Sequence, residues 1–272
     1  MLRCSYNRQV PRIVGDGAKT RSAEPAGRAA LHPVTRDWFA GRFRSPSPAQ
    51  EEAWPRILAG KSTLISAPTG SGKTLAAFLC AIDRLVFDSV PPPPQTGARS
   101  RPGRSSPGVR VLYISPVKAL ARDVDRNLQE PLASICALAT ERGVPHVRPR
   151  VAVRSGDTPS TERQRMRRNP PDILITTPES LFLILTSEAH VMLRTVETII
   201  VDEIHAIVGT KRGAHLALSV ERVARLASGA VQRVGLSATS KPLDLVARFL
   251  SGTRGPKAVS YTHLTLPTKR IV

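Results

Sequence analysis

The stretch STLISAPTGSGKT, Ser62 to Thr74, joins a short apolar run to a loop of small residues that ends in lysine and threonine. A strand, a glycine-rich loop and a helix start in this order favour anion binding, because free backbone N–H groups and the helix dipole converge on the loop. In such a loop Lys73 reaches the outer phosphates of a nucleotide and the Thr74 hydroxyl binds Mg²⁺. The expected phosphate-binding residues are Ala67, Pro68, Thr69, Gly70, Ser71, Gly72, Lys73 and Thr74.

The match to the general phosphate-loop pattern is incomplete, because Ala67 stands where that pattern has glycine. A glycine-rich turn beside a helix would give the same letters without binding a ligand. The apolar strand before the loop and the amphipathic helix after it favour phosphate binding over that simpler interpretation.

Outward from this loop, short apolar runs alternate with amphipathic helical stretches. Val- and Ile-rich runs separated by helices predict an α/β fold: one doubly wound domain with a mainly parallel sheet and helices on both faces. Its active edge should lie at the carboxyl ends of the strands. The expected strands are 62–66, 109–115, 151–155, 172–176, 197–202 and 232–237, and the expected helices are 73–87, 120–138, 162–167, 181–185, 214–227 and 243–250.

Composition divides the chain into three parts. Residues 1–34 are rich in Arg, Ala, Gly and Pro without a clear period, which predicts a flexible basic extension. Residues 35–258 form the expected domain, with a proline-rich flexible loop at 91–108. Residues 259–272 resemble the translation of a sequencing adapter, and we expect a non-native tail there; an ordinary edge strand is the alternative.

The balance of charge indicates a polyanionic partner. Forty Lys and Arg residues against 21 Asp and Glu give a formal net charge of +19, although an arginine-rich composition can also follow from a G+C-rich genome. The three cysteines, Cys4, Cys80 and Cys136, are far apart, which argues against a disulfide framework or a zinc site. We find no apolar run of membrane-spanning length and no secretory signal, and we expect a cytoplasmic protein.

A second polar cluster ends another apolar run, TIIVDEIH, Thr198 to His205. A phosphate loop needs a carboxylate across the site for magnesium and a base that orients the attacking water. Asp202 is placed for the first role and Glu203 for the second. The alternative is a helix N-terminus with acidic residues in its first turn, which is common in isolation.

Together these motifs resemble those of superfamily 2 helicases. Asp202-Glu203-Ile204-His205 reads as a DExH box, and Ser237-Ala238-Thr239 follows the next strand as the third motif of those enzymes does. Further segments resemble the Lhr ("large helicase-related") family, with Val117 where that family commonly has Leu. These segments are 54–85, 112–128, 153–181, 201–223 and 232–242, and the resemblance covers nearly everything from Trp38 to Leu250.

The resemblance implies a RecA-like domain that binds ATP and Mg²⁺. It implies that Gln50 reads the adenine, with Phe43 as a candidate stacking partner. It also implies that His205 links the nucleotide site to the motif Ser237, Ala238 and Thr239 by a polar contact. A core histidine with satisfied hydrogen bonds is the alternative.

The resemblance also implies a face that grips the phosphates of a nucleic acid. Thr and Ser before a helix are otherwise more often helix caps than ligands. The expected contacts are Ser115, Pro116 and Lys118; Arg154, Gly156, Asp157 and Thr158; Thr176, Thr177, Pro178 and Glu179; and Lys211 and Arg212. For Lys211 and Arg212 the start of a helix is an equal alternative. Arg163, Arg165, Arg167 and Arg168 either extend this track or form a solvated basic face.

We therefore expect the first RecA-like domain of an ATP-dependent helicase that moves on single-stranded DNA. The second such domain, with its arginine finger, is absent from the sequence, so the chain alone should hydrolyse ATP slowly or not at all. Two alternatives stay open: a helicase that acts on RNA or on RNA–DNA hybrids, and a non-catalytic nucleic-acid-binding remnant. Because the expected contacts are to backbone, the residues do not distinguish DNA from RNA.

Overall fold

The computed structural model describes residues 30–88, 108–238, 242–252 and 260–263. Within these ranges, no helix has the length and apolar character needed to cross a membrane. The helices are α2 (Pro33–Arg42), α3 (Pro48–Leu58), α4 (Lys73–Asp83), α5 (Lys118–Glu141), α6 (Ser160–Arg168), α7 (Pro178–Leu185), α8 (Lys211–Leu226) and α9 (Leu243–Ser251), with a π-helical turn at Arg84–Asp88 and 3-10 turns at Glu188–Leu193 and Ile204–Ala206. The strands are β1 (Thr63–Ser66), β2 (Val111–Ile114), β3 (Val151–Arg154), β4 (Ile173–Thr176), β5 (Thr198–Val201), β6 (Gln232–Ser237) and β7 (Ser260–His263).

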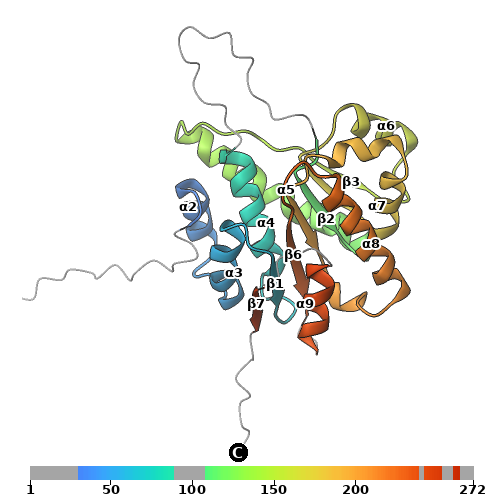
Figure 1. Cartoon of the computed structure of the whole chain (residues 1–272). Helices are drawn as coiled ribbons and strands as arrows, with labels where there is room; N and C mark the ends of the chain where they lie inside the picture. Colours follow the sequence, from blue (N-terminus) through green and yellow to red (C-terminus); the bar gives the residue numbers. More distant parts are fainter. Residues whose placement is uncertain (1–29, 89–107, 239–241, 253–259, 264–272) are drawn as a thin grey trace, which may run out of the picture.

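The strands form one seven-stranded sheet in the order β3-β4-β2-β5-β6-β1-β7. Every neighbouring pair runs parallel, which confirms the predicted sheet. Strands β1 and β2 are separated in space by β5 and β6, and β2 and β3 are separated by β4, so later strands lie between earlier ones. Figure 1 shows α2, α3 and α4 on one side of the sheet and α7, α8 and α9 on the other.

Two hydrophobic layers hold the helices to the sheet. Tyr113 packs with α2–α5 on one face, whereas its neighbours Leu112 and Ile114 pack with α7–α9 on the other. This alternation follows from the two-residue period of a strand. Because both faces are covered, the strands need apolar residues at successive positions, and β1, β2, β4 and β5 are buried throughout.

The sheet order brings three predicted motifs together. Strands β5, β6 and β1 are consecutive neighbours, and their carboxyl ends carry the DEIH sequence, the SAT sequence and the phosphate loop respectively. Parallel strands end at the same edge, so residues far apart in sequence become neighbours there. This edge is the candidate site.

The boundaries of the domain differ from those predicted. The structure places Leu31 and Val34 in the core and begins α2 at Pro33, so residues 31–34 belong to the domain and not to the extension. Gly108, the last residue of the expected loop, is buried beside Thr195. Residues 1–29 and 89–107 lie outside the described part of the chain.

The expected tail also contributes to the sheet. Residues 260–263 pair in parallel with β1, from Thr63↔Ser260 to Ser66↔His263, which matches the edge-strand alternative for this segment. The pairing does not bear on the origin of the segment, so the non-native tail stays a prediction. Residues 264–272 lie outside the described part.

Candidate nucleotide site and coupling network

The loop after β1 adopts a conformation that its glycines allow. Gly70 and Gly72 have φ angles of 81° and 79°, in the left-handed region where a side chain is strained. Gly72 is the residue from which α4 begins, and its carbonyl accepts from the Ala76 N–H at 2.9 Å. The first turn of α4 therefore directs free N–H groups toward the loop, as an anion site requires.

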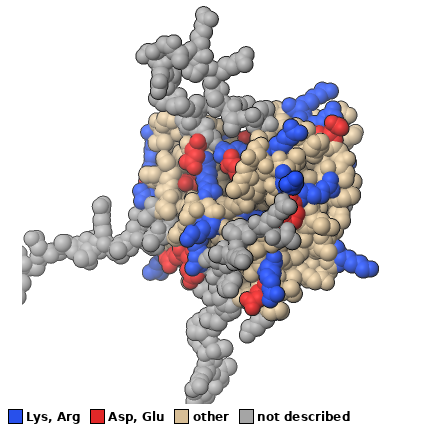
Figure 2. Space-filling view, viewed as in Figure 1, with Lys and Arg blue, Asp and Glu red and all other residues tan. Residues whose placement is uncertain are grey.

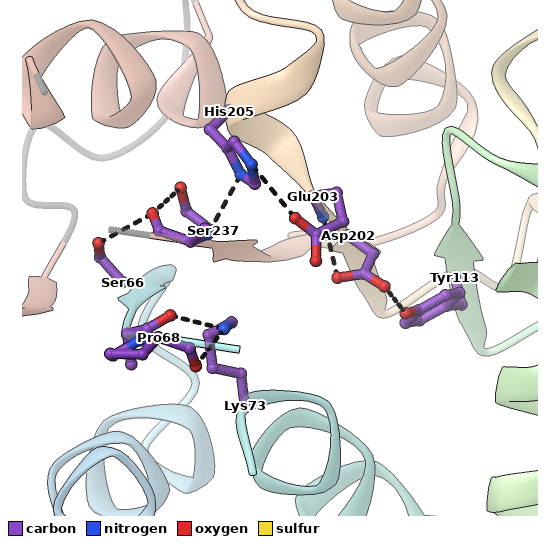
Figure 3. A network of polar contacts seen from close by, with 10 residues as sticks. Ser66, Pro68, Lys73, Tyr113, Asp202, Glu203, His205 and Ser237 are labelled. Carbon is purple, nitrogen blue, oxygen red and sulfur yellow. Dashed lines mark hydrogen bonds and ion pairs between the residues drawn. The ribbon is translucent and has the colours of Figure 1, made fainter. Parts of the chain in front are cut away.

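Lys73 is held inside this loop. Its ammonium donates to the carbonyls of Ala67 at 2.6 Å and Pro68 at 2.8 Å, and its side chain is buried. Burial lowers the pKa of Lys73, while the carboxylates of Glu203 and Asp202 oppose that shift. An anionic ligand could bind to the Lys73 ammonium, provided that a cation screens it from the carboxylates on the other side (Figure 3).

Asp202 is a buried carboxylate whose two oxygens both have donors. Its Oδ2 accepts from the Tyr113 hydroxyl and its Oδ1 accepts from the Glu203 N–H at 2.9 Å. Loss of solvation raises the pKa of Asp202 despite these hydrogen bonds and despite Lys73. An ionised carboxylate in this position would be stabilised by a cation.

Glu203 has an unusual backbone conformation. Its φ of 44° is the one positive value among the non-glycine residues that the structure describes. The left-handed region costs a residue with a side chain about 1–2 kcal/mol. From this turn the Glu203 side chain points toward His205 (Figure 3). Strain of this kind is concentrated at functional sites.

His205 joins two of the predicted motifs. Its Nδ1 accepts a hydrogen bond from the Ala238 N–H at 3.1 Å, which leaves the proton on Nε2. That nitrogen lies 3.3 Å from the Glu203 carboxylate. The imidazole therefore connects the DEIH sequence to the SAT sequence, but through a backbone amide.

This contact corrects one detail of the expected network. The Ser237 hydroxyl donates to the Ala238 carbonyl at 2.8 Å, and Ser66 approaches the same carbonyl at 3.4 Å. The backbone of Ala238 is thus in contact with the ends of β1 and β6 and with the DEIH turn. Thr239 lies outside the described residues.

Gln50 lies next to the loop, but its amide already has protein partners. The Oε1 atom accepts from the Ser47 N–H at 2.9 Å, and Nε2 donates to the Gly72 carbonyl at 3.4 Å. The Ser47 hydroxyl donates to the Ser71 carbonyl at 2.8 Å, so the start of α3 is tied to the phosphate loop. Phe43 stacks on Phe39, with ring centroids 4.7 Å apart. The geometry leaves adenine recognition by Gln50 and Phe43 as a prediction.

A cavity of about 400 Å³ opens between the loop, the carboxylates and α5. Its polar wall carries Lys73, Asp202 and Glu203, and its apolar wall comes from α4 and α5. The lining residues are Thr69, Gly70, Gly72, Lys73, Thr74, Leu75, Phe78, Ile82, Asp123, Val124, Asn127, Leu128, Pro131, Asp202 and Glu203.

The residues at this cavity fit a magnesium ion that arrives with a nucleotide. Within the described ranges, no group of three or more His, Cys, Asp or Glu could hold a metal on its own. Magnesium is usually bound by one or two protein oxygens together with phosphates and water. The Thr74 hydroxyl and the Asp202 carboxylate, which both line the cavity, supply oxygens of that kind.

The predicted nucleic-acid contacts have internal partners. Thr177 caps α7 by accepting from the Ser180 N–H at 3.4 Å, and Thr176 donates to the Arg154 carbonyl at 2.8 Å. Thr158 accepts from the Ser155 N–H at 2.9 Å. These bonds match the helix-cap and turn alternatives, and they leave contact with a nucleic acid untested.

The remaining members of that set are spread over the surface and the interior. Ser115, Pro116, Arg154, Thr158, Thr176, Thr177 and Pro178 are buried, whereas Gly156, Asp157, Glu179, Lys211 and Arg212 are exposed. Arg212 forms a two-pronged ion pair with Glu179, at 2.6 and 3.1 Å, which joins the start of α8 to the start of α7. The side chain of Lys118 lies outside the described part.

The arginines of α6 lie largely at the surface. Arg165, Arg167 and Arg168 are exposed, and Arg163 donates to the Gly156 carbonyl at 2.8 Å. In Figure 2 the basic side chains lie at several separate places on the face drawn, several of them next to acidic ones. This distribution matches a solvated basic face as well as it matches a phosphate track.

Tyr113 belongs to the site, but the sequence motifs do not include it. Its hydroxyl is aimed at Asp202 and its ring stacks on Phe78, with centroids 4.7 Å apart. The available signal was a tyrosine inside a fully apolar strand, since a buried phenol needs a hydrogen-bond partner.

Comparison with known proteins agrees with this geometry. Residues 47–246 match the family model of the DEAD/DEAH box helicases. The chain is 54% identical over 233 residues to a Lhr helicase and probable uracil glycosylase of Mycolicibacterium smegmatis, and this region is 86% of the chain but 14% of that protein. A Lhr helicase/uracil glycosylase of Escherichia coli is 50% identical over 240 residues, which are 88% of the chain and 15% of that protein.

A solved structure gives the same result. The helicase Lhr of Mycobacterium smegmatis, bound to ssDNA and AMP-PNP, superposes with a TM-score of 0.76 at 51% identity, over 89% of this chain and 28% of that one. The RecA-like fold and the resemblance to Lhr helicases are thereby confirmed. The chain belongs to the DEAD/DEAH box helicase family, and within it resembles the first RecA-like domain of Lhr helicases.

Proposed function

We propose that this chain is the ATP-binding part of a helicase that uses ATP and Mg²⁺ to move on single-stranded DNA. The observation that carries the proposal is the continuous polar path from Glu203 through His205 to Ala238, opposite Lys73. The similarity to a Lhr helicase solved with ssDNA and AMP-PNP supports both ligands. The cytoplasmic location expected from the sequence stays a prediction.

The roles of the residues follow from their positions. Lys73 and the loop amides would hold the phosphates, while Thr74 and Asp202 would hold the magnesium ion, which screens phosphate charge. Glu203 would orient the attacking water, because its carboxylate lines the same cavity and is not buried. His205 would couple a movement of the Glu203 carboxylate to the backbone at the end of β6, because it contacts both.

We further propose that turnover needs parts of the longer relatives that this chain does not cover, since it spans 14% of one of them. Phosphoryl transfer commonly needs an arginine at the transferred phosphate. Among the described residues that line the cavity, none is arginine.

The test is a matched pair of variants in the longer protein that contains this chain. Glu203→Gln should lower DNA-stimulated ATP hydrolysis by about 10²–10⁴-fold while a fluorescent ATP analogue still binds. Glu197→Gln changes an exposed carboxylate directly before β5 and should leave turnover unchanged. Full turnover in Glu203→Gln would refute the role of Glu203.

The same assay separates the alternatives. Stimulation by single-stranded RNA or RNA–DNA hybrid but not by DNA would favour the RNA alternative. Nucleic-acid binding without ATP hydrolysis in the longer wild-type protein would indicate a non-catalytic remnant.

A further inference from the structure

The buried tyrosine of β2 contacts two parts of the nucleotide site at once. Tyr113 is fully buried, and its hydroxyl donates to Oδ2 of Asp202. Its ring stacks on Phe78 of α4 with an interplanar angle of 24°. Since α4 begins at Lys73, one side chain lies between the helix of the phosphate loop and the carboxylate that follows β5.

The hydroxyl fixes the orientation of the Asp202 carboxylate. Oδ2 has the phenol as donor, and Oδ1 has the Glu203 N–H at 2.9 Å. One donor on each oxygen opposes rotation of the carboxylate about its Cβ–Cγ bond. Each oxygen keeps a further lone pair, which can accept from a metal-bound water.

The backbone of Asp202 is fixed by the same strand. Ile114 pairs with Val201, and the Asp202 N–H donates to the Ile114 carbonyl at 2.9 Å. Strand β2 therefore sets the position of the Asp202 main chain, and the Tyr113 hydroxyl sets the direction of its side chain.

Core packing does not by itself require this hydroxyl. A phenylalanine ring at position 113 would stack equally well on Phe78, and it would not need a polar partner in the interior. The hydroxyl instead meets a carboxylate that faces Lys73 across the cavity. Outer partners of this kind orient metal-binding groups in proteins.

We propose that Tyr113 is a positioning residue, which holds the Asp202 carboxylate in the orientation that receives the hydrated magnesium ion of the nucleotide. The inference rests on the proposed ATP site and adds a residue to it. Through the Phe78 stack, the same side chain keeps this carboxylate in register with the helix that begins at Lys73.

The test is Tyr113→Phe in this chain, with nucleotide binding as the readout. A fluorescent ADP analogue is titrated at a series of Mg²⁺ concentrations and again in EDTA. We expect the Mg²⁺ concentration for half-maximal enhancement of binding to rise about tenfold, as for other partners of metal-binding groups, while affinity in EDTA stays unchanged. Binding of Mn²⁺ in the presence of ADP, followed by electron paramagnetic resonance, should weaken in parallel.

Thr198→Val is the matched control. This variant also removes a buried hydroxyl, but from the first residue of β5, at the end of the strand away from Asp202. The Thr198 hydroxyl faces Gln232. This variant should bind Mg²⁺ and nucleotide as the wild type does. Thermal melts of both variants check that they fold.

The outcomes separate the two proposals. Equal Mg²⁺ dependence in Tyr113→Phe and wild type would overturn the positioning role and leave the ATP site intact. If Tyr113→Phe does not fold, or if its affinity for the ADP analogue falls equally with Mg²⁺ and in EDTA, the hydroxyl has a purely structural role. Either result would also overturn the positioning role. Absence of nucleotide binding by the wild type at any Mg²⁺ concentration would overturn both.

Discussion

Two buried aspartates, Asp202 after β5 and Asp83 at the end of α4, look alike by burial and by the direction of their pKa shifts. Asp202 is 4% exposed and Asp83 is 8% exposed. Desolvation is the largest cause of the raised pKa of each carboxyl group. A search for buried acids with perturbed pKa values would select both.

Their neighbours distinguish them. Asp83 accepts from the His32 N–H at 3.1 and 3.2 Å, directly before α2, so it fastens that helix to α4. Asp202 lies beside Lys73 and lines the cavity of the phosphate loop. The comparison shows that a perturbed carboxyl marks a site only where a cavity and a complementary charge meet it.

The largest expected effect is on Asp202. Replacing Asp202 with Asn in the longer protein should lower ATP turnover by about 10³-fold, because metal stabilisation of a phosphoryl-transfer transition state is worth several kcal/mol. The melting temperature should not fall, since a buried charge is removed. Steady-state ATPase assays and thermal melts measure the two. A variant with normal turnover, or one that loses activity only because it unfolds, would make Asp202 the equivalent of Asp83.

The next prediction concerns nucleotide affinity and the two glycines of the phosphate loop. Gly72→Ala adds a Cβ atom 2.5 Å from Gln50 Nε2, whereas Gly70→Ala points into open space. Both variants bear left-handed strain of about 1–2 kcal/mol. Only Gly72→Ala also displaces Gln50, so its nucleotide affinity should fall about fivefold further, the equivalent of one lost hydrogen bond. Equal affinities, by fluorescence titration, would show that the Gln50 contact is dispensable.

At His205 we expect an effect on coupling and not on nucleotide affinity. His205→Ala removes the contacts to Glu203 and Ala238, but no contact to the phosphate loop. Nucleotide affinity should stay within about twofold, while stimulation of ATPase by DNA should fall about tenfold, the size of one lost charge-assisted hydrogen bond. His215→Ala, an exposed histidine of α8, is the control. An equal loss of nucleotide affinity in His205→Ala would contradict the coupling role.

The sequence predicts the edge of the sheet that carries the candidate site, because each of its motifs directly follows a strand. The phosphate loop, the DEIH sequence and the SAT sequence each follow an apolar run, and parallel strands bring such ends together. The sequence pattern does not predict the two helices before the loop, α2 and α3. Their core side chains, such as Trp38 and Trp54, lie within a stretch interrupted by glycine and proline.

Contacts that depend on strand order could not be predicted. Tyr113 reaches Asp202 because β2 pairs with β5, although β3 and β4 lie between them in the sequence. The Arg212–Glu179 pair needs α7 and α8 side by side. His205 contacts the SAT sequence as the resemblance implies, but its partner is the backbone amide of Ala238, directly after β6, and no sequence pattern indicates a backbone partner.

The smallest expected effect is on Asp83, and it is on stability. Because the folded state raises the pKa of Asp83, it holds the proton more tightly than the unfolded chain does. The resulting stability is complete below the unfolded pKa and is lost as pH rises through the folded one. Asp83→Asn lacks this titration. As the pH rises from 4 to 7, the unfolding free energy of the wild type should therefore fall relative to that of the variant.

Urea unfolding at each pH measures this difference, and Asp244→Asn, at an exposed aspartate of α9, controls for the loss of one negative charge. In the longer protein, ATPase activity of Asp83→Asn should equal that of the wild type, because Asp83 touches α2 and not the cavity. If the difference in unfolding free energy between wild type and Asp83→Asn does not change with pH, the hydrogen bond from the His32 N–H fully offsets the effect of burial on the Asp83 pKa. A loss of ATPase activity would instead extend the functional site into the α2–α4 contact, and the distinction between the two aspartates would fail.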